Sequence, residues 1–180
     1  TTRASAPESD GAITVGALNT RGTVARSDDA IASYSSRGPV GSADEPSGWE
    51  IKPDLVAPGN AIVSAGAVGS YLWNNYAERQ VYGANGGAYF TLSGSSMAAA
   101  VVSGAVAQLL QAQPKLTPQE VKFALQYTAQ HLEGFGLIEQ GAGSLNVPLA
   151  AGLVNSRDLN QIAATSTIGG EAVAAGGLVF

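Results

Sequence analysis

The chain has 180 residues, which fits one domain or one large piece of a domain. With 45% hydrophobic residues, only 13% charged residues and 23 glycines, it predicts a turn-rich protein with a core, not a charged helical bundle. The net charge of −5 and the scarcity of lysine exclude a non-specific nucleic-acid surface and a basic face for an anionic membrane.

The composition gives little support for a metal site or for disulfide bonds. Cysteine is absent and His131 is the only histidine, which excludes disulfide scaffolds, thiol chemistry and a multi-histidine metal site. Calcium ligands are loop carboxylates, and four acidic residues lie in predicted loops: Asp28, Asp29, Asp44 and Glu45. Their spacing fits no calcium motif, so we predict solvated loop charges and no cofactor, with calcium as an alternative that no motif supports.

Short apolar segments with β-branched residues predict an α/β fold with a parallel sheet. The predicted strands are residues 13–18, 54–57, 61–65 and 88–92. The first two strands are expected to be adjacent and parallel. The polar, glycine-rich residues 19–50 and the aromatic residues 66–87 are predicted as turns and loops.

Two helices are predicted in the second half of the chain. Residues 94–96 open a helix that runs to about residue 113, and its apolar or small side chains on every side predict a central, buried helix. Residues 117–120 have the pattern of a capping box with proline at the first helical position, and this second helix is expected to end near His131. No apolar run approaches the about 20 residues of a membrane span.

The two ends of the chain predict a piece of something larger. The sequence begins Thr1-Thr2-Arg3, with no initiator methionine and no signal peptide. Residues 154–180 are polar and then rich in alanine and glycine, so we place a boundary after residue 153. The tail that follows is interpreted as a flexible end or as the start of a further module.

The most informative segment is residues 92–104, in which a strand leads through Gly94 into a helix that Ser95 and Ser96 open. The first N–H groups of a helix lack internal partners, and the helix dipole places partial positive charge there. A serine at this position can present its hydroxyl to a carbonyl group while its own N–H stabilises the resulting oxyanion. Gly94 permits a close approach of substrate backbone. The alternative is an ordinary serine at the start of a core helix.

Several segments, in order along the chain, resemble those of the subtilisin-like serine peptidases, the subtilases. Gly94-Ser95-Ser96-Met97-Ala98-Ala99 is similar to the nucleophile motif Gly-Thr-Ser-Met-Ala-x-Pro. Residues 13–17 resemble the Val-Gly-Ala strand, residues 33–39 the Phe-Ser-x-Arg-Gly-Pro segment, and residues 52–59 the Lys-Pro-Asp-(apolar)-x-Ala-Pro-Gly segment. Residues 140–143 with Val147 resemble the segment that closes the catalytic domain. The resemblance therefore predicts the C-terminal part of a doubly wound subtilase sheet.

The resemblance implies that Ser96 is the nucleophile and that its N–H is one oxyanion donor. Ser95 stands where the family has threonine, whose hydroxyl lies near the oxyanion. Two positions depart from the motif, since Ala100 replaces proline and Val101 replaces a common histidine. Alanine is a better helix former than proline, so we expect Ser96 to be undisturbed.

The family's aspartate, histidine and oxyanion-asparagine segments have no counterpart here. In the family's chain order all three precede the nucleophile, whereas His131 follows Ser96 and is expected to be a surface or helix-end histidine. A serine without a base is a poor nucleophile at neutral pH. The isolated chain is therefore expected to be inactive as a protease.

Three interpretations follow from this pattern. The first is the nucleophile-bearing portion of an endopeptidase that cleaves polypeptides, with the other catalytic groups supplied by an N-terminal half. The second is a stand-alone hydrolase with weak activity on esters, and the third is a non-catalytic structural remnant. The family implies an extracellular location. We also expect a homo-oligomer, because the strand at residues 13–18 would otherwise have an open, apolar edge.

Overall fold

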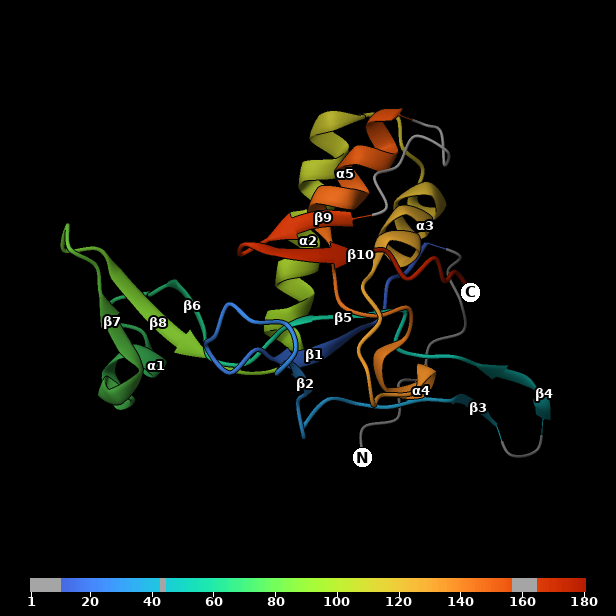
Figure 1. Cartoon of the computed structure of the whole chain (residues 1–180). Helices are drawn as coiled ribbons and strands as arrows, with labels where there is room; N and C mark the ends of the chain where they lie inside the picture. The colour runs from blue at the N-terminus through green and yellow to red at the C-terminus, as the bar shows by residue number, and fades with distance from the viewer. Residues whose placement is uncertain (1–10, 43–44, 157–164) are drawn as a thin grey trace.

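The computed structural model describes residues 11–42, 45–156 and 165–180. It has a mixed α/β fold in which a small sheet carries a layer of helices, and a lobe and a hairpin extend from opposite sides of this body (Figure 1). The strands β1 (Val15–Asn19), β2 (Ala30–Ile31) and β5 (Leu55–Pro58) form the sheet in the order β2-β1-β5.

The central strand β1 confirms one prediction and corrects another. It pairs in parallel with β5, from Val15 opposite Leu55 to Leu18 opposite Pro58, as the sequence predicts. Its other edge is not open, because β2 pairs antiparallel with it through Leu18 and Ile31. The hydroxyl oxygen of Ser35 accepts the N–H of Ala17 further along the same edge. The expected exposed edge at residues 13–18 is therefore wrong at Ala17 and Leu18, where the chain folds back and pairs with β1, whereas the described pairs do not reach residues 13–16.

Side chains alternate across the sheet and fill two clusters, as the two-residue period of a strand requires. Ala17, Leu55 and Ala57 face the helices, whereas Leu18 and Val56 pack on the other side with Leu132. The covering helices are α2 (Ser95–Ala112), α3 (Pro118–Thr128) and α5 (Val147–Ser156).

Helix α2 has the predicted bounds but not the predicted burial. Its buried side chains form one stripe, Ala98, Val102, Ala105 and Leu109, which packs against β1, β5 and α5. The opposite face is exposed, so the expectation of burial on every side is wrong for the described part of the chain. By length and composition alone, with a mean hydropathy of 1.3, α2 would pass as a membrane span. Its packed stripe is the arrangement of a helix at the edge of a core.

Helix α3 begins as predicted. The Thr117 hydroxyl accepts the N–H of Glu120, and the Glu120 carboxylate accepts the N–H of Thr117 at 2.7 Å, which completes the capping box. The helix ends at Thr128, before the predicted His131, and its buried stripe contains Val121, Ala124 and Leu125.

A lobe of residues 62–92 leaves the body beside the start of α2 (Figure 1). It contains β6 (Ile62–Ala65), α1 (Tyr71–Asn75), the 3-10 turn η1 (Ala77–Arg79), β7 (Gln80–Tyr82) and β8 (Ala88–Leu92), with the sheet order β6-β8-β7. Strands β6 and β8 lie where the sequence predicts them. The predicted loop between them is wrong in part, because Ser70 caps α1 and Trp73 packs against Tyr82 and Phe90.

Two hairpins complete the structure, together with the short helix α4 (Leu137–Gln140). β3 (Val40–Ser42) pairs with β4 (Glu45–Glu50) in a stretch predicted to contain only turns. In the tail, β9 (Thr165–Ile168) pairs with β10 (Glu171–Ala174), and Val173 is buried. The Ser166 hydroxyl donates to Asn146 at 2.9 Å, so this hairpin packs on the body. The boundary after residue 153 stays a prediction.

Candidate active site

Ser96 lies in the first turn of α2 with its side chain exposed. Its hydroxyl has no hydrogen-bond partner among residues 11–42, 45–156 and 165–180. Gly94 is the N-cap residue and provides no side-chain hydrogen bond to the first N–H groups of the helix. Among the described residues the N–H groups of Ser95 and Ser96 therefore have no partner, which is the arrangement found in anion sites at helix N-termini.

Hydrogen bonds from both neighbouring strands fix the turn that precedes Ser96. The N–H of Gly94, after β8, donates to the carbonyl oxygen of Gly59, after β5, at 2.8 Å. The hydroxyl oxygen of Ser93 accepts the N–H of Ala61 at 2.8 Å. The carbonyl oxygen of Gly94 in turn accepts the N–H groups of Met97 and Ala98. The turn is therefore rigid on the side of the sheet and open on the side of solvent.

The two glycines of this region have different local roles. A Cβ at Gly59 would lie 2.8 Å from the Gly94 carbonyl oxygen and 2.8 Å from Ala17 Cβ, so the close packing of β1, β5 and α2 requires glycine there. A Cβ at Gly94 would meet no atom closer than Met97 Sδ at 3.4 Å. The chain itself thus leaves space at Gly94, and the expected close approach of a substrate backbone fits that space.

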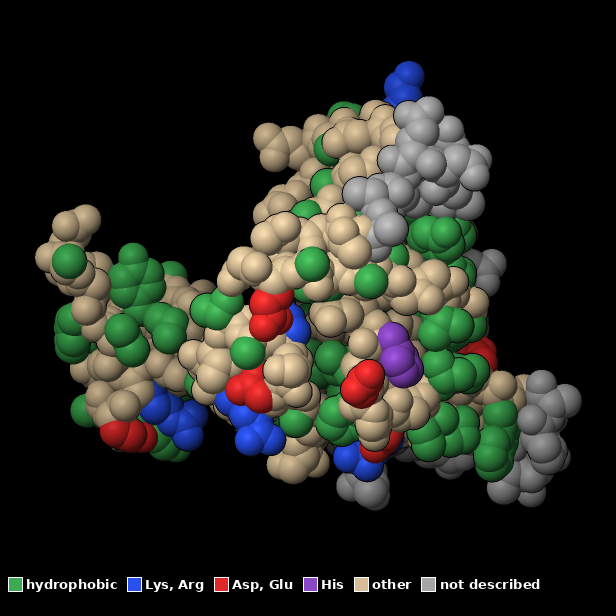
Figure 2. All heavy atoms as spheres, in the orientation of Figure 1, with side chains coloured by type: hydrophobic (Ala, Val, Ile, Leu, Met, Phe, Trp, Pro, Cys, Tyr) green, Lys and Arg blue, Asp and Glu red, His purple; other side chains and the backbone are tan. Residues whose placement is uncertain are grey.

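An apolar cavity of about 470 Å³ separates the start of α2 from the lobe. Met97, the residue after Ser96, lines it together with Trp73 and Phe90 of the lobe. Figure 2 shows that hydrophobic side chains also gather on the outside of the lobe, where Tyr71 and Tyr82 are largely exposed. Apolar surface next to Ser96 is therefore extensive in the described structure.

His131 lies beyond the end of α3 with an exposed side chain, and no hydrogen bond links it to Ser96. In the described residues, no hydrogen bond joins the Ser96 hydroxyl to a carboxylate or an imidazole.

The loop carboxylates do not assemble a metal site within the described residues. The Asp28 carboxylate accepts the Thr23 hydroxyl at 2.9 Å. Asp29 is buried and lies 3.4 Å from the Arg26 guanidinium, and burial raises the pKa of its carboxyl above the usual value, against the opposing effect of Arg26. Asp44 lies outside the described residues, as does the side chain of Glu45.

Sequence reasoning missed a buried ionic cluster centred on Asp54. Its carboxylate is fully buried and accepts the N–H of Thr14 at 2.6 Å, while Lys122 of α3 lies 3.0 Å and Lys52 lies 3.3 Å from it. The Lys-Pro-Asp segment signals the nearby Lys52, but nothing local signals Lys122. The cluster ties the sheet to α3 and lies outside the Ser96 turn.

The chain is similar in sequence and in fold to several known proteins. The subtilase family model matches residues 1–161. The serine protease AprX of Bacillus subtilis is 39% identical over 145 residues, which are 81% of this chain and 30% of AprX. Fervidolysin from Fervidobacterium pennivorans superimposes with a TM-score of 0.55 at 30% identity, over 78% of this chain and 19% of its own.

The CspB protease of Clostridium perfringens superimposes with a TM-score of 0.58 at 27% identity, over 81% of this chain and 27% of its own. The chain thus spans less than a third of each of these three relatives. The α/β fold superimposes on part of the two solved structures, and the family match covers most of the sequence. This chain belongs to the subtilase family.

Proposed function

We propose that this chain is the nucleophile-bearing portion of a subtilisin-like serine endopeptidase, with Ser96 as the nucleophile. The observation that carries the proposal is the exposed Ser96 hydroxyl at the start of α2, behind a glycine N-cap that leaves the first helical N–H groups unpaired. Its substrates are polypeptides, the substrate class of the family.

The chemistry assigned to these groups is acyl transfer. The Ser96 oxygen attacks the peptide carbonyl carbon, its proton passes to a base, and the carbonyl oxygen becomes an oxyanion that the Ser96 N–H stabilises. The C–N bond then breaks, the amine leaves with a proton, and an acyl ester remains on Ser96. Attack by water on that ester releases the acid and restores the hydroxyl. Ser95 and Gly94 line the oxyanion and substrate side of this position.

The base is supplied by a further polypeptide that packs on the exposed face of α2. Two observations favour such a partner. The face of α2 opposite its buried stripe carries small side chains that allow close packing, and it continues into the apolar cavity beside the lobe. The relatives are also more than three times as long as the matched region. A complementary N-terminal half covers this surface, and a second copy of the chain covers it when that half is absent.

Reaction with a fluorophosphonate probe tests the nucleophile directly. Because no base lies beside Ser96 in the described residues, we expect slow uptake that depends on oxyanion stabilisation at the start of α2 alone. After prolonged incubation, intact-mass analysis should find one covalent adduct, on Ser96, and this adduct should disappear in Ser96→Ala. Ser103→Ala is the matched control, because Ser103 is an exposed serine of the same helix whose hydroxyl donates to the Ala99 carbonyl oxygen. An adduct that survives Ser96→Ala contradicts the assignment.

Activity assays separate the proposed portion of an endopeptidase from a stand-alone esterase. We expect the isolated chain to leave casein uncut, because no base lies beside Ser96 in the described residues. Turnover of an activated ester that is lost in Ser96→Ala would instead favour the esterase. Absence of both turnover and probe uptake would favour a structural role.

We further propose the extracellular location that is common in the family. An antibody against the chain should detect it in the culture medium of producing cells. Detection only in the cell lysate, with the medium free of it, would contradict this location.

A further inference from the structure

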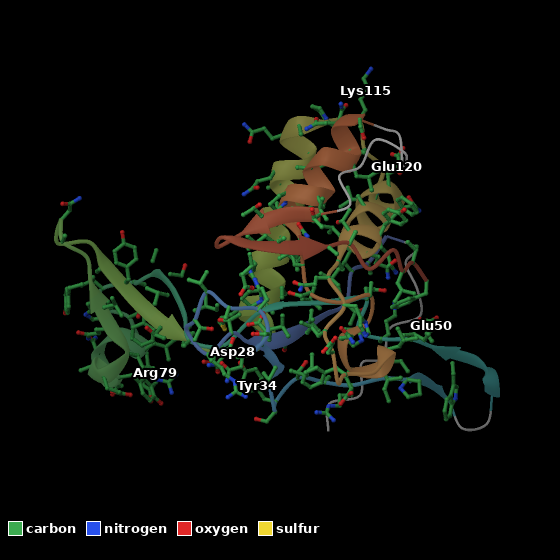
Figure 3. The ribbon with its side chains drawn as sticks, viewed as in Figure 1. Asp28, Tyr34, Glu50, Arg79, Lys115 and Glu120 are labelled. Carbon is green, nitrogen blue, oxygen red and sulfur yellow. The ribbon has the colours of Figure 1, made fainter. Side chains whose placement is uncertain are left out.

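Tyr34 follows β2 and directs its hydroxyl at the turn before Ser96; the residue is labelled in Figure 3. The hydroxyl donates to the carbonyl oxygen of Gly59 at 3.0 Å and lies 3.4 Å from the side-chain oxygen of Asn60. The ring is partly exposed, at 45% of the residue's surface. The family segment that residues 33–39 resemble has phenylalanine at this position.

The carbonyl oxygen of Gly59 links this hydroxyl to the start of α2. It accepts both the Tyr34 hydroxyl and the N–H of Gly94, at 3.0 and 2.8 Å. The Gly94 carbonyl oxygen then accepts the N–H groups of Met97 and Ala98, the third and fourth residues of the helix. A displacement of the Gly59 carbonyl group would therefore shift the peptide planes that carry the N–H groups of Ser95 and Ser96.

Hydrogen bonds to the sheet fix the backbone next to Tyr34. The N–H of its neighbour Ser35 donates to the carbonyl oxygen of Ala32 at 2.9 Å, and the Ser35 hydroxyl oxygen accepts the N–H of Ala17 of β1 at 3.0 Å. Burial raises the pKa of the Tyr34 hydroxyl above its usual 10.0, against a smaller lowering by the neighbouring Ser93 side chain and Gly94 backbone. The hydroxyl therefore remains a donor at neutral pH.

We propose that Tyr34 is a positioning residue for Ser96, acting through the shared carbonyl oxygen of Gly59. Its hydroxyl fixes the orientation of that carbonyl group, and thereby the Gly94 peptide and the first turn of α2. Tyr34 does not touch the reacting atoms in this role. The inference rests on the proposed function of Ser96.

The test compares Tyr34→Phe with the wild-type chain. The control is Tyr71→Phe, because Tyr71 is 72% exposed and its hydroxyl has no hydrogen bond to any described residue. Saturation kinetics with a fluorophosphonate separate the maximal rate of Ser96 modification from the apparent affinity for the probe. Loss of one hydrogen bond predicts a maximal rate about threefold to tenfold lower in Tyr34→Phe, with unchanged affinity. Tyr71→Phe should match the wild type in both.

Amide hydrogen exchange at Gly94 provides a readout that needs no reaction at Ser96. We expect faster exchange of this one amide in Tyr34→Phe, with a melting temperature like that of Tyr71→Phe. An unchanged Gly94 exchange rate, or an unchanged maximal rate in a chain that takes up the probe, overturns the proposal. If the wild-type chain takes up no probe, the function proposed for Ser96 fails separately, and Gly94 exchange alone then decides whether the hydroxyl holds the turn.

Discussion

The N–H of Gly94 donates to the carbonyl oxygen of Gly59 at 2.8 Å, and this bond joins the end of β5 to the start of α2. The lobe of residues 62–92 lies between the two glycines in sequence. Gly59 is fixed in turn by its own N–H, which donates to the carbonyl oxygen of Leu18 of β1 at 3.0 Å. The position of Ser96 relative to the sheet thus depends on a backbone path that runs through two glycines and a strand end.

Gly59→Ala should disturb this path by steric overlap. The added Cβ would lie 2.8 Å from both Ala17 Cβ and the Gly94 carbonyl oxygen, and the surrounding backbone has no flexible side chain that could move aside. We expect a loss of about 1–3 kcal/mol in the free energy of unfolding, measured by urea denaturation. Fluorophosphonate uptake at Ser96 should slow in the same variant.

Gly104→Ala is the control for this substitution. Gly104 lies in α2, and a Cβ there would meet no atom within 4 Å. Alanine should therefore stabilise the helix by about 0.5–1 kcal/mol. If Gly59→Ala were as stable as the wild type, the close approach at Gly59 would not constrain the fold.

The sequence predicted those features that local chemistry determines. The first and last residues of α2 follow from a glycine-serine start and a long apolar run, and the start of α3 follows from a capping box that lies within four residues. The parallel pair β1 and β5 follows from two short apolar segments. The start of the candidate site was predictable for the same reason, because Ser96 and its helix are neighbours in sequence.

The features that sequence reasoning missed depend on contacts between distant residues. Only one stripe of α2 is buried, since what covers a helix is not encoded within that helix. The β3–β4 hairpin brings Val40 opposite Glu50, although the residues between them favour turns. The hydroxyl of Tyr34 gains its role only from the approach of Gly59, which belongs to another strand end.

Asp54→Asn should be strongly destabilising. The carboxylate is fully buried and neutralises two lysines, Lys122 at 3.0 Å and Lys52 at 3.3 Å, each with a side chain only 14% exposed. Asp54→Asn removes the negative charge, and two largely buried ammonium groups then lack the counter-ion that they share. We expect a loss of about 3–5 kcal/mol in the free energy of unfolding, read from the urea midpoint at constant slope.

A surface pair provides the comparison for Asp54. Glu78 lies 3.7 Å from Arg79 with its side chain 68% exposed, so Glu78→Gln should change stability by less than about 0.5 kcal/mol. Equal effects of the two substitutions would show that the Asp54 cluster contributes no more than a surface pair does.

The buried Asp29 predicts a pH dependence of stability with a definite sign. Burial is the largest effect on its carboxyl and raises its pKa above the usual 3.8. A raised folded-state pKa means that the contribution to stability is fully present below pH 3.8 and is lost as the pH rises through the folded-state value. The wild type should therefore gain stability relative to Asp29→Asn as the pH falls from about 7 towards 4.

Paired urea titrations of the wild type and Asp29→Asn at each pH measure this difference, because the other carboxyl groups are common to both chains. The opposite trend, in which the wild type loses stability relative to Asp29→Asn on acidification, would mean that the ion pair with Arg26 outweighs burial.

The exposed face of α2 predicts that the isolated chain self-associates. This face carries small side chains at Ala99, Ala100, Ser103, Gly104 and Ala107, and it adjoins the apolar cavity of the lobe. Because β2 covers part of the outer edge of β1, we expect the interface on this helix and not at residues 13–18. Burial of the face is favourable by about 25 cal/mol per Å² of apolar area, and small side chains let a second copy approach closely. We expect light scattering to report a species larger than the 18.1 kDa monomer.

Gly104→Glu tests this interface without disturbing the chain itself, because the space around Gly104 is open for at least 4 Å in the direction of a Cβ. A carboxylate in the centre of the face would lose its hydration on association and find no positive partner there, so the variant should be monomeric. Ser36→Glu adds the same charge at an exposed site outside α2 and should leave the association unchanged. A wild-type chain that is a stable monomer on dilution, or a Gly104→Glu chain that associates as the wild type does, would show that this face of α2 is not where the chain meets its partner.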